Sequence, residues 1–91
     1  MLRSEAHVHI ALDLAQRPSS NAALFLDLCE RSLGCAADTR VGAQLARLAS
    51  VLAGRLDRGG EGLARVAAVI EATPHSVMRT VALKKVARLR A

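Results

Sequence analysis

Three histidines, two cysteines and eight carboxylates are the side chains in this chain that could bind a metal ion or catalyse a reaction. His9 and Asp13 are four residues apart and would share one face of a helix, whereas His7 and His9 would point in different directions. A tight metal site normally has three or four protein ligands, and the spacing supplies no third ligand here. The sequence therefore predicts no metal site.

The two cysteines, Cys29 and Cys35, match neither the spacing of a common zinc pair nor that of a redox pair. Two cysteines are also too few for a disulfide framework, so we expect a reducing compartment, and specifically the cytoplasm. Both thiols fall near the C-terminal end of a predicted helix, where the helix dipole disfavours a reactive thiolate. The carboxylates are scattered and no loop is long enough to shape a substrate pocket, which indicates a protein that is not an enzyme and takes no cofactor.

Charge is the remaining chemical signal, and it is concentrated in the C-terminal half. Residues 1–38 carry three arginines against five acids, a balance of −2, and residues 39–91 carry ten Arg and Lys residues against three acids, a balance of +7. Such a balance suits a nucleic acid, an acidic protein or an anionic surface, and it is equally typical of a solvated surface in an arginine-rich chain. No apolar run is longer than that of residues 66–70, which is far too short to span a membrane.

The composition favours helices as the elements that position these residues. The chain has 18 alanines, 14 leucines and 11 arginines against ten valines and isoleucines, and its one aromatic side chain is Phe25. This balance matches helix propensity far better than strand propensity. A chain of 91 residues is long enough for one domain only, so we expect a single all-α domain, residues 1–91, with an aliphatic core.

Local signals predict five helices in this domain. The first helix runs from about Ser4 to Gln16 and is stopped by Pro18. A second helix follows an N-cap among residues 19–21 and ends before Gly34, which we expect as its C′ residue. The apolar stripes of these two helices are Val8, Ala11, Leu12 and Ala15, and Leu24, Phe25, Leu28, Cys29 and Ser32.

The third helix has the clearest amphipathic pattern. It is capped by Asp38 or Thr39, and its apolar residues recur at spacings of four, three, four and four. These residues are Val41, Leu45, Leu48, Leu52 and Leu56. We expect this face to form the seam of the fold.

Two further helices complete the prediction. Gly59 and Gly60 interrupt the pattern, and a fourth helix follows them. Its predicted buried residues are Leu63, Val66, Ala67 and Ile70. Thr73 and Pro74 are predicted as the N-cap and first residue of a fifth helix that continues to about Arg90.

Taken in pairs, these helices predict antiparallel hairpins, arranged as a tetratricopeptide-like stack or as a compact bundle. Three of the five carry wide aliphatic faces, and a chain this short can wrap few of them completely. We therefore expect apolar surface that is covered by another protein chain or by a second copy. The residues predicted to form this partner surface or the seam are Phe25, which anchors the first hairpin, Leu28, Leu48, Leu52 and Leu56.

Residues Leu24–Gly34 and Gln44–Ala49 resemble a helical hairpin of the tetratricopeptide type. Within that class they are most similar to the small chaperones that bind needle subunits in bacterial type III secretion. The resemblance implies a concave helical surface that shields the amphipathic helix of a partner, which is read through apolar anchors at i, i+3, i+4 and i+7. Our leading prediction is a non-enzymatic chaperone, adaptor or regulator that covers a partner's helix with an aliphatic groove, with a homo-oligomer as one form.

A second segment, Val66–Val81, resembles the helix-turn-helix of LuxR-type regulators and sigma-factor DNA-binding domains. The similarity lies in Val66, Ala67, Ile70, residues 72–77 and Val81, at the positions where two such helices bury against each other. It implies an alternative function, a small transcriptional regulator that binds DNA through residues 63–90. The residues implied to face the major groove are His75, Ser76, Met78, Arg79 and Ala82, and those implied to touch phosphates are Arg65, Lys84, Lys85 and Arg88.

Overall fold

The computed structural model of the chain describes residues 4–35, 38–56 and 60–90. All regular structure in these residues is helical, which confirms the predicted all-α class. The five α-helices are α1 (Glu5–Ala15), α2 (Ala22–Ser32), α3 (Thr39–Ala53), α4 (Glu61–Ala72) and α5 (Val77–Arg90), and a short 3₁₀ helix, η1 (Leu33–Cys35), follows α2.

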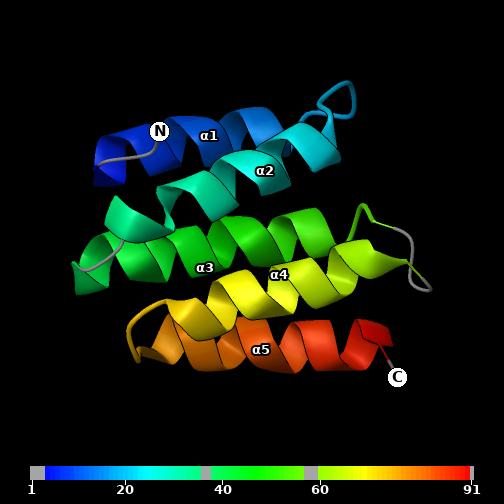
Figure 1. Cartoon of the computed structure of the whole chain (residues 1–91). Coiled ribbons are helices and arrows are strands. Elements are labelled where there is room, and N and C mark those ends of the chain that lie inside the picture. Colours follow the sequence, from blue (N-terminus) through cyan, green and yellow to red (C-terminus); the bar gives the residue numbers. More distant parts are fainter. Residues whose placement is uncertain (1–3, 36–37, 57–59, 91) are drawn as a thin grey trace.

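The helices form two layers. Figure 1 shows α1, α3 and α5 side by side in one layer, with α2 and α4 lying across them and running in the opposite direction. α3 occupies the centre and packs against each of the other four helices, while α1 and α5 lie at the two ends of the stack. The result is a slab of 31 × 28 × 18 Å. Its two ends each expose one side of a helix.

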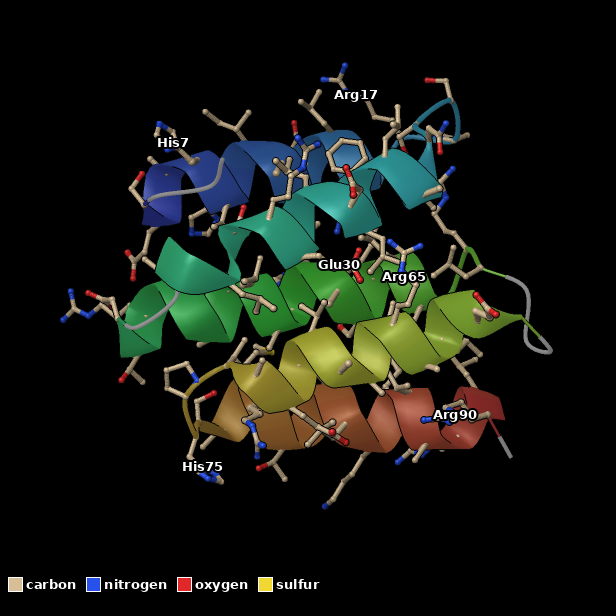
Figure 2. All side chains as sticks on the ribbon, in the orientation of Figure 1. His7, Arg17, Glu30, Arg65, His75 and Arg90 are labelled. Atoms are coloured by element: carbon tan, nitrogen blue, oxygen red, sulfur yellow. The ribbon has the colours of Figure 1, made fainter. Side chains whose placement is uncertain are left out.

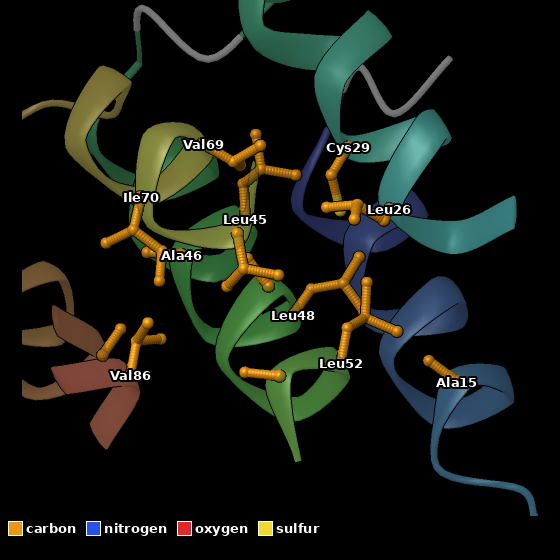
Figure 3. Packing of buried hydrophobic residues seen from close by; sticks show 14 of the residues in the cluster. Ala15, Leu26, Cys29, Leu45, Ala46, Leu48, Leu52, Val69, Ile70 and Val86 are labelled. Atoms are coloured by element: carbon orange, nitrogen blue, oxygen red, sulfur yellow. The ribbon is translucent and has the colours of Figure 1, made fainter. Parts of the chain in front are cut away.

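α3 supplies the middle of the hydrophobic core. Leu48 and Leu52 are 0% exposed, and Figure 3 shows them between α3 and α1. On the other side of α3, Ile70 of α4 and Val86 of α5 close the core, and Ala46 lets these helices approach closely. The predicted seam is therefore the inner face of this one chain.

Side chains cap the first three helices. Asn21 Oδ1 accepts hydrogen bonds from the backbone N–H groups of Ala23 at 3.0 Å and Leu24 at 3.3 Å, and Asp38 Oδ1 accepts from Arg40 N–H at 2.7 Å. These bonds satisfy N–H groups that have no partner inside the helix. The predicted caps at Asn21 and Asp38 are confirmed.

α3 ends earlier than its leucine pattern predicts. Gly54 is its C-cap, and the next two N–H groups bond back to Leu52 and Ala53, which tightens the chain into a turn. Leu56 therefore lies outside the helix, half-buried, beside the first turn of α4. A Cβ atom on Gly62 would lie only 3.1 Å from Leu56 Cδ1, so a glycine at this position permits the close approach.

The predicted start of the fifth helix is also wrong. Thr73 has an extended backbone, with φ −80° and ψ 156°, and it ends α4 instead of capping α5. Proline disfavours the helical conformation in the residue before it, and the Thr73 hydroxyl donates to the carbonyl of Ile70 at 2.6 Å. α5 begins three residues after Pro74, where Ser76 Oγ accepts from the backbone N–H of Arg79 at 3.0 Å.

Gly34 differs from its predicted role as well. It lies within η1, and none of the glycines in the described residues has the positive φ of a left-handed cap. The chain leaves α2 through a 3₁₀ turn instead. Of the predicted glycine break before α4, Gly60 is the N-cap residue of that helix, and Gly59 lies outside the described residues.

Candidate protein-binding surface

Five large aliphatic side chains of the described residues are exposed to solvent. They are Ile10 (60% exposed), Leu14 (39%), Leu24 (65%), Val77 (83%) and Val81 (56%). Single exposed aliphatic residues are ordinary on protein surfaces, but four of these five belong to α1 and α5 at the two ends of the stack, and Leu24 belongs to α2, which neighbours α1. Each end therefore presents exposed aliphatic side chains to solvent.

At the first end, α1 turns two aliphatic residues away from the core. The buried stripe of α1 is Val8, Ala11, Leu12 and Ala15. Ile10 and Leu14 are one turn apart on the opposite side of this helix. Because α1 packs against α3 through its buried stripe, Ile10 and Leu14 face outward from the end of the stack.

The neighbouring helix α2 extends this surface. Leu24 is exposed, and Phe25 and Leu28 are half-buried and pack against the core from outside. Together with Ile10 and Leu14 they form what we name the apolar end patch, defined by Ile10, Leu14, Leu24, Phe25 and Leu28.

The five residues predicted for the partner surface or the seam separate into three groups. Phe25 and Leu28 lie in the apolar end patch, Leu48 and Leu52 are fully buried in the core, and Leu56 packs beside α4. Sequence reasoning missed Ile10 and Leu14 as surface residues. Their signal was present, since both are large aliphatic residues that fall off the predicted buried stripe of the first helix.

Charged side chains near the patch are paired with a neighbour four residues away in the sequence. Arg17 lies 3.8 Å from Asp13 and Arg31 lies 2.8 Å from Asp27, each pair four residues apart and largely exposed. Figure 2 shows His7 of α1, and Arg17 just beyond the C-terminal end of α1, on this outer side. Such exposed pairs contribute little stability, and they leave the surroundings of the patch close to neutral.

Two arginines hold the hairpins together. Arg55 donates to the backbone carbonyls of Ala15 (3.0 Å), Pro18 (3.3 Å) and Ser20 (2.6 Å) and to the Ser20 hydroxyl, which fixes the loop between α1 and α2 to the end of α3. Arg65 of α4 donates to both carboxylate oxygens of Glu30 on α2, through Nε at 3.1 Å and through Nη2. Figure 2 shows this pair meeting between the two helices.

The Glu30–Arg65 contact also changes the ionisation of both groups. The hydrogen bond from Arg65 lowers the pKa of Glu30, and the hydrogen bond to Glu30 raises the pKa of Arg65. The resemblance to a helix-turn-helix implied a phosphate contact for Arg65. In the structure its guanidinium is already paired with a carboxylate.

Cys29 lies in the core as a free thiol, fully buried. Burial, and secondarily the charge of Glu30, raises its pKa from 9.0 to about 12. A thiol with this pKa stays protonated near neutral pH and acts as a small apolar side chain.

The packing expected for the helix-turn-helix is wrong at the start of α5. Val77 and Val81, expected between the two helices, are exposed, and Ala82, expected in the major groove, is 1% exposed. The reason is that α5 lies along α3 and α4 and turns Ala82 and Val86 toward them. The predicted base reader Arg79 is half-buried and contacts the preceding loop.

Arg79 contacts this loop and the last turn of α4 through two hydrogen-bonding groups. Its Nη1 lies 3.2 Å from His75 Nδ1, and its Nη2 donates to the carbonyl of Glu71 at 3.2 Å. Ser76 is occupied as the N-cap of α5. The remaining residues of the alternative, Lys84, Lys85 and Arg88, are exposed, and His75 and Arg90 mark the two ends of this region in Figure 2.

The described residues contain neither a candidate metal site nor a candidate membrane-spanning helix. No group of three or more histidine, cysteine or acidic side chains in residues 4–35, 38–56 and 60–90 could hold a metal ion. Within the same ranges, no helix combines the length and the apolar character needed to cross a bilayer.

The chain matches no protein-family model, no curated protein and no solved structure. The resemblances to tetratricopeptide chaperones and to helix-turn-helix regulators therefore rest on the residues that suggested them.

Proposed function

We propose that the chain is a non-enzymatic protein-binding module, a small chaperone or adaptor, that covers the amphipathic helix of a partner with the apolar end patch. The observation that carries this proposal is the exposure of Ile10 and Leu24, at 60% and 65%, on neighbouring helices at one end of the stack.

Exposed aliphatic residues are unusual at the end of a stack of helices. Stacked helical hairpins normally close their ends with polar faces, because an apolar end promotes association. Here α1 exposes Ile10 and Leu14, its neighbour α2 exposes Leu24, and Phe25 and Leu28 of α2 are half-buried against the core. A large aliphatic side chain that becomes fully covered by a partner contributes roughly 1.5–3 kcal/mol to association.

A helix is the partner element that fits this surface best. α1 and α2 run antiparallel, and each presents aliphatic residues spaced by one helical turn: Ile10 and Leu14 on α1, and Leu24 and Leu28 on α2. A partner helix lying along α1 and α2 would place its own apolar residues, at positions i, i+3, i+4 and i+7, against the aliphatic residues of both helices. The nearly neutral rim favours an apolar interaction that salt changes little.

A second copy of the chain is the other occupant with suitable chemistry. Its apolar end patch would pack against the same patch in a two-fold dimer. Light scattering of the purified chain distinguishes the two cases, since a homodimer has twice the monomer mass. A reducing compartment such as the cytoplasm suits either assembly, because the free thiol of Cys29 is part of the core.

Site-specific photo-crosslinking in the cells that produce the chain tests the proposal. A photoreactive residue is placed at Ile10, at Leu24 and, as the control, at Arg47, which is exposed on α3 away from the patch. We expect positions 10 and 24 to capture the same protein and position 47 not to capture it. Identical adducts from all three positions would contradict the proposal.

A further inference from the structure

The opposite end of the stack carries a second surface of different character. Val77, Val81, Lys84 and Arg88 are spaced at i, i+4, i+7 and i+11 along α5, so they share one side of that helix. All four side chains are exposed, with Val77 at 83% and Val81 at 56%. We name these four residues the α5 outer face.

The cations of this face have no carboxylate partner in the part of the chain that the structure describes. The ion pairs of the described residues involve Arg17, Arg31 and Arg65, and none involves α5. α5 itself contains five Arg and Lys residues and no Asp or Glu. Its positive charge is therefore uncompensated, in contrast to the paired charges around the apolar end patch.

We propose that the α5 outer face docks an acidic amphipathic helix of a different protein. The first half of the face offers two aliphatic side chains and the second half two cations. A helix with aliphatic residues one turn apart, followed one and two turns further on by Asp or Glu, matches both halves at once. The apolar half contributes affinity, and the charged half fixes direction and register.

The same pattern argues against a second copy as the occupant. The exposed aliphatic pair of α1, Ile10 and Leu14, has one acid between its members, Asp13, which is paired with Arg17. The residues one turn beyond the pair on either side are His7 and Arg17, so docking on the α5 outer face would place no carboxylate at the positions that face Lys84 and Arg88. If two α5 helices packed together in parallel, the cations of one would lie against the cations of the other. If they packed antiparallel, the cations of each would lie against the valines of the other.

A nucleic acid fits the pattern less well. Phosphates would pair with Lys84 and Arg88, but Val77 and Val81 would then meet a polar backbone and contribute nothing. The two exposed valines thus favour a protein partner over a nucleic acid. This inference concerns a different end of the molecule from the apolar end patch and does not depend on the function proposed there.

Selection from a displayed library of helical peptides of the same 14-residue length as α5 tests the proposal. We expect the selected peptides to pair aliphatic residues at i and i+4 with acids one and two turns away. Anisotropy measurements on the best peptide then give its affinity. Raising the salt from about 0.05 to 0.5 M should weaken binding by about tenfold or more, because exposed charges become screened.

Variants of exposed residues give matched controls for the selected peptide. Lys84→Glu with Arg88→Glu should abolish binding. Arg40→Glu with Arg47→Glu, which changes the net charge equally on the exposed side of α3, should leave most of it. Val77→Ser with Val81→Ser should weaken binding by about tenfold, since covered apolar area is lost without a change of charge.

Three results would overturn the proposal. The first is a selection without acidic aliphatic peptides. The second is an equal loss of binding in the α3 control variant. The third is tighter binding of a DNA duplex, an RNA hairpin or phosphatidylglycerol vesicles than of any selected peptide, with no effect of the two valine substitutions.

Discussion

Arg55 is an exposed side chain that connects two distant segments of this small protein. Its planar guanidinium donates to three carbonyls and one hydroxyl of residues 15–20, so the first loop is positioned by the end of α3. Only arginine presents several N–H donors in a fixed plane, and lysine would satisfy these acceptors incompletely. The sequence gives no local signal of this role, because the acceptors lie 35 to 40 positions away in the chain.

Replacing Arg55 by alanine should lower the free energy of unfolding by about 1–2 kcal/mol, since charged hydrogen bonds to backbone carbonyls are lost at an exposed position. Urea denaturation measures this change. Arg47→Ala is the matched control, and we expect it to stay within about 0.5 kcal/mol of the wild type. Equal stability of the two variants would show that the contacts of Arg55 contribute nothing.

The thiol of Cys29 provides a second test at the level of one residue. With its pKa raised to about 12, its thiolate is scarce at pH 8. In a Cys35→Ser variant, where Cys29 is the remaining thiol, Ellman's reagent should react only as fast as the chain opens. Unfolding in urea should restore the rate of an ordinary cysteine, and a native rate equal to the unfolded rate would contradict the burial.

Among the helices, the sequence predicted best where a side chain acts on its own backbone. The caps at Asn21 and Asp38 follow from bonds spanning two or three residues. The predicted start of the fifth helix was wrong because two local signals competed. Thr73 followed by Pro74 is typical of a helix start, but Ser76 is the residue that caps α5. Leu56 continues the apolar spacing of α3, yet Gly54 ends the helix first.

Leucines on different elements should respond differently to truncation. Leu48→Ala, in the centre of α3, should lower the free energy of unfolding by about 2–5 kcal/mol because it leaves a cavity. Leu24→Ala, on the exposed side of α2, should change it by less than about 0.5 kcal/mol. Guanidinium denaturation of the two variants measures the difference, and similar losses would contradict the placement of the apolar end patch.

The pair formed by Glu30 and Arg65 ties α2 to α4 in a pH-dependent way. Because the folded chain lowers the pKa of Glu30, the stability from this pair is complete above the usual titration range of glutamate. It is lost as the pH falls through the lowered pKa. Glu30→Gln should therefore melt below the wild type at pH 7 and at the same temperature as the wild type in strong acid. A difference in melting temperature that persists in strong acid would show that the ionisation of Glu30 is not its cause.

The whole molecule is a stack whose two ends differ. One end is aliphatic with paired charges around it, and the other combines two valines with cations that have no carboxylate partner among the described residues. The basic C-terminal half was evident in the sequence, and so was the excess of aliphatic residues. Their arrangement was not, because Ile10, Leu24 and Val77 become exposed only through the way the helices stack around α3.

The most direct test of a binding role for the apolar end patch is the dissociation constant of the partner segment captured at Leu24, measured as a synthetic peptide against the wild type and against Leu24→Glu. We expect the variant to bind at least about tenfold more weakly, since a covered leucine is replaced by a charge. Its free energy of unfolding should stay close to that of the wild type. Equal affinity of the two proteins would contradict a binding role for the apolar end patch.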